Sequence, residues 1–455
     1  MRFQIVQGDE QLSSHSGLAL VGAILDRSQI RERLDTVILP EHPFPEISHG
    51  EVATTMVGLI CLGKPDFDAI EAFRDDPFFL QSLGLGSVPS SPTLRQRLDS
   101  ARGGFNDIIL EESAKLVGRI APVITPCHGN LVAVDIDVSP FDNSGTKKEG
   151  VSWTYKKVDG YAPIFAYVGE EGYLINLELR PGSDHSQKGT DAFLRRTLRY
   201  ARLMSRSTER SLRGDSGEAR RSQATFLVRL DSGNDSLDNI KVCQQEKAHY
   251  IIKRNLRWET VEKWLEIARE CGRMEEPRPG KQVWTGERYI QRAGVKQPLR
   301  IVFCVTLRTT EADGQALLIP RIEVETYWTS LNDDAETVIR LYRAHGTSEQ
   351  FHSELKTDLG LERLPSGKFQ TNELVLLLGM VAYNLLRMIG QESLREADAP
   401  IRKQVSRRRV RSVMQDLIYL ACRLVSHARR WTLSFGRYCP WLTTWRRVYL
   451  RLAPT

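Results

Sequence analysis

Cysteine is scarce in this 455-residue chain, and the seven cysteines form no CxxC pair and no regular framework. Zinc ribbons need closely spaced pairs of ligands and disulfide scaffolds need a regular spacing, so the pattern argues against both. Scattered single thiols are typical of a reducing compartment, and we therefore expect a cytoplasmic protein.

The chain also lacks a targeting segment and an uninterrupted hydrophobic run. Met1–Gly8 is short and polar, unlike a secretory signal peptide. The longest apolar stretch, Leu374–Ile389, is broken by Asn384 and Arg387 and falls short of the roughly 20 residues that cross a bilayer. We interpret this stretch as a buried helix and expect no membrane partner.

Acidic residues are nearly absent after Ile401, where Asp416 is the only one. Basic residues crowd the same region at Arg402, Lys403, Arg407, Arg408, Arg409, Arg411, Arg429, Arg430, Arg446 and Arg447. Aromatic residues interleave with them at Trp431, Trp441, Trp445 and Tyr449. This pattern favours a polyanionic partner, most simply nucleic acid. The alternative is a solvated, arginine-rich helical surface.

A chain of this length exceeds one compact core and predicts several domains. Residues 14–102 have helical periodicity, and we expect a helical DNA-binding domain over residues 1–125. Ser91 can cap a helix that begins at Pro92 and presents Arg95 and Arg97 near its start. Short helices ending in such a polar helix fit a helix-turn-helix unit, and a plain helical bundle is the alternative.

The middle of the chain predicts strands. Leu131–Val138 alternates, with Asp135 and Asp137 on its polar face, where they need a cation or solvent. Further strands are expected at residues 160–169, 173–179, 226–230, 299–307 and 316–325, a helix at 189–204, a surface loop at 205–222 and a long helix from Asp334. We therefore expect an α/β core in two parts, 126–254 and 329–390, separated by a strand-rich insertion at 255–328 and followed by a basic helical region at 391–455.

Three acids stand at strand ends or on a polar helix face: Asp135 or Asp137, then Asp231, then Glu349. The order strand Asp, strand Asp, helix Glu fits an RNase H-like nuclease or transferase core. Hard cations prefer oxygen ligands, and two metal ions about 3.5–4 Å apart can activate a nucleophile and stabilise a leaving oxygen.

The helix that carries Glu349 has an unusually polar face. Residues recur there at steps of three and four, at Tyr342, His345, Glu349, His352 or Ser353, and Lys356. A carboxylate flanked by basic groups suits a site for a metal and a phosphate. A solvated face with a Glu–Lys ion pair is the alternative.

This segment resembles the Y-(2)-R-(3)-E-(6)-K motif of bacterial insertion-sequence DDE transposases, which have an RNase H-like core. Tyr342, Glu349 and Lys356 match, whereas His345 stands at the position of the arginine. Histidine is charged only in part near neutral pH, so a permanent cation is missing there.

Further steps resemble the same family in the same order. Asp137-Val-Ser139 matches its D-x-T/S step and favours Asp137 over Asp135 as the first acid. The R-x-D-S-G step is matched around Asp231, and the segment Leu179–Ser186 resembles its L-R-x-G-N step.

The resemblance implies a nucleoid-associated DNA transposase that cuts and joins DNA at the inverted-repeat ends of an insertion sequence. Asp137, Asp231 and Glu349 would hold two Mg²⁺ ions, with Mn²⁺ as a substitute. The partners would be the terminal inverted repeats, target DNA and a second subunit, because two ends must be brought together.

The remaining contacts to DNA follow from the same resemblance. Tyr342, His345 and Lys356 would contact phosphates, and Arg95 and Arg97 would read the inverted repeat. In related transposases an aromatic residue of the insertion stacks on a flipped base, and the candidates here are Trp328, Trp284 and Trp258. Two rivals stay open: a nuclease that cuts without joining, and a silent DNA-binding derivative.

Overall fold

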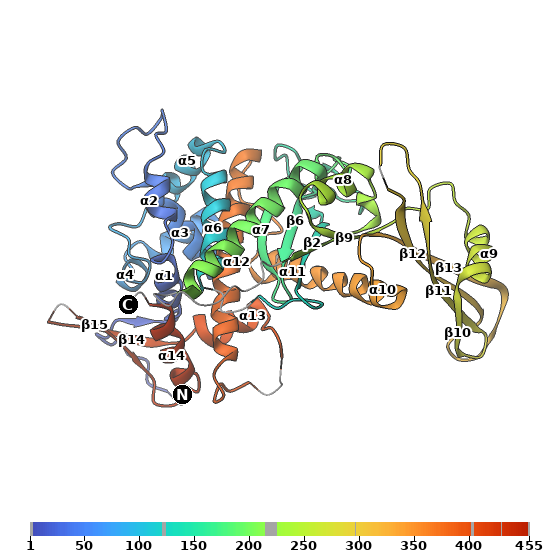
Figure 1. Ribbon diagram of the computed structural model, residues 1–455. Helices are drawn as coiled ribbons and strands as arrows, with labels where there is room; N and C mark the ends of the chain where they lie inside the picture. The colour runs from blue at the N-terminus through green and yellow to red at the C-terminus, as the bar shows by residue number, and fades with distance from the viewer. Residues whose placement is uncertain are drawn as a thin grey trace.

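The computed structural model describes residues 3–120, 124–213, 225–295, 297–401, 405–428 and 430–453, with backbone only for 208–213. A nine-stranded mixed sheet runs through it in the order β10-β11-β12-β13-β9-β8-β2-β6-β7 (Figure 1). Helices pack on this sheet and on one another, so the predicted α/β class is confirmed.

Five strands form the centre of the sheet. β2 (Leu131–Val138) lies parallel to β8 (Thr225–Leu230), and β8 lies parallel to β9 (His249–Lys253). On the other side, β6 (Ile164–Val168) and β7 (Tyr173–Glu178) continue the sheet with antiparallel pairing. The apolar side chains of β2 and β6 are buried on both faces, which is the usual state of strands covered by helices.

The insertion extends this sheet instead of forming a separate one. β10 (Arg273–Arg278), β11 (Lys281–Ile290), β12 (Leu299–Thr310) and β13 (Ala316–Thr329) are antiparallel neighbours, and the end of β13 pairs with β9. α9 (Val261–Cys271) packs on β11, β12 and β13. The whole unit projects away from the rest of the chain (Figure 1).

Long helices cover the other end of the sheet. α6 (Asn106–Ile120), α7 (Thr190–Arg213) and α12 (Phe369–Leu394) all pack on β7, and α8 (Leu237–Gln245) packs on α7. α12 is long and apolar enough to cross a membrane, but 94% of its apolar window is buried inside the protein, as expected for a core helix. The prediction of a loop from residue 205 is wrong up to Arg213, which is helical; residues 214–222 lie outside the described residues. Arginine favours helices, and the polarity reflects only exposure.

The N-terminal part is helical, as predicted. It contains α1 (Leu18–Leu25), α2 (Ile30–Asp35), α3 (His49–Cys61), the 3₁₀ helix η1 (Phe67–Phe73), α4 (Pro77–Ser82) and α5 (Ser91–Ala101). α3, α5 and α6 pack on α12, so these helices share one hydrophobic core with the sheet. The cap of α5 is Ser90 and not Ser91, because Ser90 accepts the hydrogen bond from the Thr93 amide.

The C-terminal region is not wholly helical, which corrects the prediction. After α13 (Val410–Val413) and the π turn η5 (Met414–Ile418), β14 (Cys422–His427) and β15 (Arg430–Phe435) form a hairpin, and α14 (Leu442–Leu452) follows. β1 (Leu12–Ser13) pairs with β14, so a partner distant in sequence stabilises the hairpin. Only Cys422 and Leu424 of β14 are buried. This alternation of buried and exposed residues is too short to indicate a strand in an arginine-rich region. Arg402, Lys403 and Arg429 lie outside the described residues.

Two smaller units flank the carboxyl ends of β2 and β8. The first is a sheet of β3 (Phe141–Asp142), β5 (Asp159–Tyr161) and β4 (Ser152–Trp153). The second is the segment after the insertion: α10 (Ala335–Arg343), the 3₁₀ turn η3 (Ala344–Thr347), α11 (Ser348–Ser353) and the π turn η4 (Glu354–Asp358). The predicted single helix from Asp334 is therefore a helical segment that changes its pitch three times.

Candidate active site

A cleft with a volume of about 750 Å³ opens where these two units meet the sheet. Its lining contains all six residues that the sequence motifs singled out for the core: Asp137, Asp231, Tyr342, His345, Glu349 and Lys356. They come from the ends of two strands and from one helical segment, and together they span more than 200 residues of the chain. The fold thus brings these predicted residues together.

The two aspartates are adjacent because β2 and β8 are parallel neighbours. Ile136 pairs with Leu230, so the residue after each, Asp137 and Asp231, stands at the same level of the sheet. The carboxyl ends of parallel strands form the usual crevice for ligands in α/β proteins. An Asn234 side-chain amide donates to Asp231 Oδ1 at 2.8 Å and orients it.

Asp135 does not line the cleft. The guanidinium of Arg229 on β8 donates to both its carboxylate oxygens, at 2.5 and 2.6 Å, and His345 Nδ1 lies 3.0 Å from Oδ1. Burial raises the pKa of Asp135, but Arg229 and His345 outweigh it and hold that pKa near 2. Asp135 is therefore a buried structural anion, and Asp137 is the acid of this strand that faces the cleft.

Asp135 also changes the character of His345. Burial lowers the pKa of this imidazole, but the hydrogen bond and the charge of Asp135 more than offset it, and the pKa is raised. The position where the motif has arginine thus holds a histidine whose cationic form is stabilised by a buried carboxylate. The charge of Asp135 thus favours the protonated imidazole, which histidine alone holds only in part near neutral pH.

The two cleft aspartates have pKa values that diverge. Burial raises the pKa of Asp137, but the hydrogen bond from His352 outweighs it, and the pKa is lowered. Burial and the charge of Asp137 raise the pKa of Asp231. Two facing carboxylates that disfavour each other's charge are the donor set expected of a divalent cation site.

His352 is a site residue that the sequence indicated only as one of two choices. Its Nε2 lies 3.2 Å from Asp137 Oδ2, and its Nδ1 lies 3.1 Å from the Tyr167 hydroxyl. Burial lowers its pKa, so the ring is neutral. Nε2–H then donates to Asp137 while Nδ1 accepts from Tyr167. The sequence feature that pointed to His352 is its position three residues after Glu349, which places both side chains on one face of a helix.

Glu349 stands apart from the aspartates. Its side chain is exposed on α11 at the edge of the cleft. Among the described residues no group of three His, Cys, Asp or Glu side chains is close enough to hold a metal ion. Asp137 and Asp231 fit a cation by chemistry and position, and Glu349 fits by its place on the cleft.

Lys356 and Tyr342 complete the polar helix face. The Lys356 ammonium donates to the Pro140 carbonyl at 2.5 Å and lies 5.3 Å from the centre of the Phe141 ring. Burial lowers its pKa to about 8. The Tyr342 ring packs 4.6 Å from that of Tyr327, and burial together with the charges of Asp231 and Asp137 raises its pKa.

Two residues predicted to contact DNA are instead held inside the protein. Arg97 is buried and donates to the Ile47 carbonyl at 2.9 Å, whereas Arg95 is half exposed, 3.6 Å from Asp68. Trp328 is buried, with its indole N–H donating to Asp235 at 2.9 Å. In this structure neither Arg97 nor Trp328 offers a free surface to a ligand.

The three tryptophan candidates differ in exposure. Trp284 is buried like Trp328, and Trp258 is 97% exposed in the loop before α9. Sequence could not separate them, because the neighbours of a tryptophan along the chain do not decide whether its ring is buried by residues distant in sequence.

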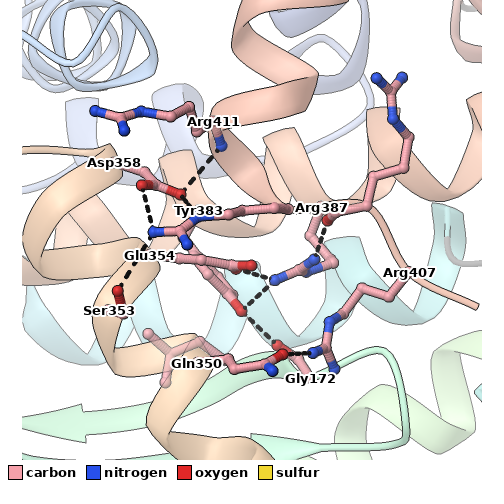
Figure 2. Close-up of polar contacts among 12 residues, drawn as sticks. Gly172, Gln350, Ser353, Glu354, Asp358, Tyr383, Arg387, Arg407 and Arg411 are labelled. Carbon is pink, nitrogen blue, oxygen red and sulfur yellow. Dashed lines mark hydrogen bonds and ion pairs between the residues drawn. The ribbon is translucent and has the colours of Figure 1, made fainter. Parts of the chain in front are cut away.

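A buried ionic network supports the catalytic helix from behind (Figure 2). Arg387 of α12 donates to Glu354, to the Tyr383 hydroxyl at 2.7 Å and to the Arg408 carbonyl at 2.6 Å. Arg407 donates to Gln350 on the neighbouring turn. The C-terminal segment thereby fixes the π turn that follows α11 and carries Lys356.

The same side holds a second anion, Asp358, at the end of the π turn. Arg409 binds it with two hydrogen bonds of 2.8 and 2.9 Å, and the Arg411 amide donates to it at 3.2 Å (Figure 2). Arg407, Arg408 and Arg409 of the basic C-terminal cluster therefore have structural partners. The cluster is in part a clamp for the catalytic helix.

Comparison with known proteins gives a family and similar solved structures. A family model described as "Transposase DDE domain group 1" matches residues 3–455. A piggyBac transposase, solved by cryo-EM as a synaptic complex with hairpin DNA, is similar with 11% identity and a TM-score of 0.40, over 89% of this chain and 78% of that one. No curated protein matches the chain.

Proposed function

Because the chain belongs to the Transposase DDE domain group 1 family, we propose that it cuts and joins DNA at the inverted-repeat ends of a bacterial insertion sequence. The observation that carries this proposal is the cleft itself. Asp137 and Asp231 stand side by side there, with Glu349, Tyr342, His345 and Lys356 around them.

The central sheet supports an RNase H-like core. Counted along the chain, its strands β2, β6, β7, β8 and β9 lie in the order 3-2-1-4-5, with only the second antiparallel to the rest. The first acid then lies on the first strand, the second acid after the fourth and the glutamate on the helix after the insertion. That is the placement expected of the DDE acids in such a core.

Asp137, Asp231 and Glu349 would hold divalent metal ions, most simply two Mg²⁺, at the carboxyl edge of the sheet. Such ions supply Lewis acidity and an activated nucleophile for phosphodiester cleavage. The Val138 amide donates to Asp137 Oδ1 at 2.8 Å, and His352 orients the same carboxylate through Oδ2. Asn234 does the same for Asp231.

The other cleft residues would bind the DNA end. Cationic His345 and the Lys356 ammonium lie on the helix that borders both aspartates, so a phosphate placed between them meets two positive charges. Tyr342 adds a hydroxyl donor on the same face. Such contacts position the backbone and carry no base specificity. In the insertion, exposed Trp258 is the candidate for stacking on a displaced base, and two copies of the chain would hold the two ends.

The test is cleavage and strand transfer with a duplex that carries the inverted repeat of the element, in Mg²⁺ and in Mn²⁺. D137N, D231N and E349Q should each lose both reactions and keep end binding. The matched control is D313N at the tip of the insertion hairpin, which should keep both, since its side chain caps only the Gln315 amide. An active D137N with a well-folded but inactive D135N would contradict the assignment of the first acid. Cleavage without transfer of pre-cleaved ends would establish the nuclease instead.

A further inference from the structure

The β4–β5 hairpin, residues 152–161, stands at the mouth of the cleft and has no role in the mechanism above. Its sequence interleaves aromatic and basic residues in the run Trp153-Thr-Tyr-Lys-Lys157. Tyr155 and Lys156 line the cleft together with the two aspartates. Trp153 and Tyr155 are 60% and 62% exposed, unusual values for large aromatic side chains next to a polar site.

The hairpin is held firmly against the active-site strand. The Tyr155 hydroxyl donates to the Val138 carbonyl at 3.0 Å, one residue after Asp137. On the other side Gly182 packs beneath the hairpin, where a Cβ would stand 2.2 Å from the Ser152 carbonyl oxygen. The Ser183 amide adds a 2.8 Å bond to Ser152 Oγ. The exposed rings therefore stand on a rigid support.

Two lysines at the tip of this hairpin place positive charge beside the cleft. Lys156 and Lys157 are exposed, and neither ammonium forms an ion pair with any residue that the structure describes. Lys156 is near enough to Lys356 for its charge to lower the pKa of that residue. The cleft mouth thus gathers positive charge from the hairpin and from the catalytic helix.

The backbone of Lys157 adds an independent observation. Its φ is +60°, a conformation that glycine adopts freely and that L-residues rarely adopt. The turn closes through the Lys157 amide to the Thr154 carbonyl at 2.9 Å, a contact that glycine would make equally well. A long cationic side chain occupies a position where the backbone alone favours glycine.

We propose that this hairpin binds an unpaired stretch of DNA strand beside the scissile phosphate, with Lys156 and Lys157 on its phosphates and the Trp153 ring stacked on a base. Rigid aromatic rings flanked by unpaired basic side chains are the combination that binds single strands, because every base has a face to stack on and every linkage carries a charge. Paired duplex offers no exposed base face. The inference rests on the proposed function, since it names the form in which the cleft takes its DNA.

The experiment compares two DNA probes of one sequence with the full-length protein in EDTA, using fluorescence anisotropy. One probe is a fully paired inverted-repeat end, and the other has its last five base pairs replaced by mismatches. Wild type should bind the mismatched end about tenfold tighter. W153A should reduce this preference to twofold or less, because base–aromatic stacking accounts for it. W153F, which keeps a ring, should retain most of it.

The lysine variants act on a different readout. K156A and K157G should weaken binding of both probes and lower the salt dependence of log Kd by about one charge each. Y289A and K263A, which remove an exposed ring and an exposed ammonium on the insertion, are the matched controls and should leave the preference unchanged.

A W153A variant with a wild-type melting curve and an undiminished preference would overturn the proposal, as would equal binding of the two probes by wild type. If the protein still cleaves and joins ends in either case, the failure belongs to the hairpin alone. If the proposed function is wrong, the result is different: wild type cleaves neither probe in the presence of a metal ion.

Discussion

Replacing Arg387 by methionine probes the ionic network behind the catalytic helix (Figure 2). Arg387 is among the largest fully buried side chains, and it is paired with Glu354, which is also buried. Burial raises the pKa of Glu354 even with Arg387 in place. Without the guanidinium, the folded protein accommodates Glu354 only as the neutral acid.

The cost follows from the proton that Glu354 must take up. Protonating a carboxyl with an ordinary pKa of 4.5 at pH 7 costs about 3 kcal/mol, and this is the upper bound of the loss relative to wild type, because the raised pKa of Glu354 already costs wild type part of it. The lost hydrogen bonds to Tyr383 and to the Arg408 carbonyl add about 1 kcal/mol each. Methionine restores most of the packing volume. We expect R387M to lose about 3–5 kcal/mol of unfolding free energy at pH 7, in the range for one partner of a buried pair.

The sign of the pH dependence identifies the mechanism. Folded R387M binds one proton more than the unfolded chain above pH 4.5, so its stability falls as pH rises and recovers as pH falls. Relative to wild type the loss should shrink by about 1.4 kcal/mol per pH unit below pH 7, until the pH reaches the folded pKa of Glu354 in wild type. E354Q/R387M has no carboxyl to protonate, so its loss should be smaller and independent of pH.

The assay is urea unfolding followed by tryptophan fluorescence between pH 5 and 8, with reversibility checked by dilution. The midpoints of wild type, R387M and the double variant are compared at each pH. An R387M deficit that is constant from pH 5 to 8, or a double variant as unstable as R387M at pH 8, would refute the reasoning, since the penalty would then be packing and not the uncompensated charge.

Three further predictions concern the cleft. The stabilising contribution of protonated His345 is fully present below its ordinary pKa of 6.5 and is lost as pH rises through its raised folded pKa. The unfolding midpoint of wild type should therefore decline over that pH range, and the midpoint of D135N should not. A parallel decline in both proteins would contradict the pairing of His345 with Asp135. D231N should raise the melting temperature, with a gain in unfolding free energy of order 1 kcal/mol, because it removes a buried carboxylate that Asp137 repels. Cleavage should be abolished in the same variant. A D231N variant with a lower melting temperature would show that this repulsion does not destabilise the folded protein. K157G should be as stable as wild type or more stable by about 1 kcal/mol, because the left-handed turn is relieved, and calorimetry that shows a clear loss would contradict this account of the turn.

Much of the fold could be predicted because its signals are local. The alternation in Leu131–Val138 matches β2 residue for residue, and Asp334 caps α10 as expected from a helix start there. The sequence-based predictions were wrong where residues distant in sequence, and not the local pattern, determine the secondary structure. The β14 hairpin depends on pairing with β1 from the other end of the chain, and helix α7 continues through residues that looked like a polar loop.

The site shows the same division. Motif spacing selected Asp231 and the face from Tyr342 to Lys356, because each short motif keeps its residues together whatever surrounds it. The sequence could not predict which of the candidate side chains are exposed to solvent. Arg97 and Trp328 have the composition of ligand contacts, yet both are held by neighbours far away in the chain.

The sequence by itself determined the order of strands and helices, the motif residues and the family resemblance, since these rest on periodicity and spacing along the chain. The resemblance favoured Asp137 over Asp135, but only the tertiary structure shows that Asp137 lines the cleft while Asp135 is paired with Arg229. Both lie on one face of β2, and the register of β8 places Arg229 opposite Asp135 and Asp231 beside Asp137. The same packing raises the pKa of His345, because a pKa depends on which groups surround the ring in space and not on its neighbours in sequence.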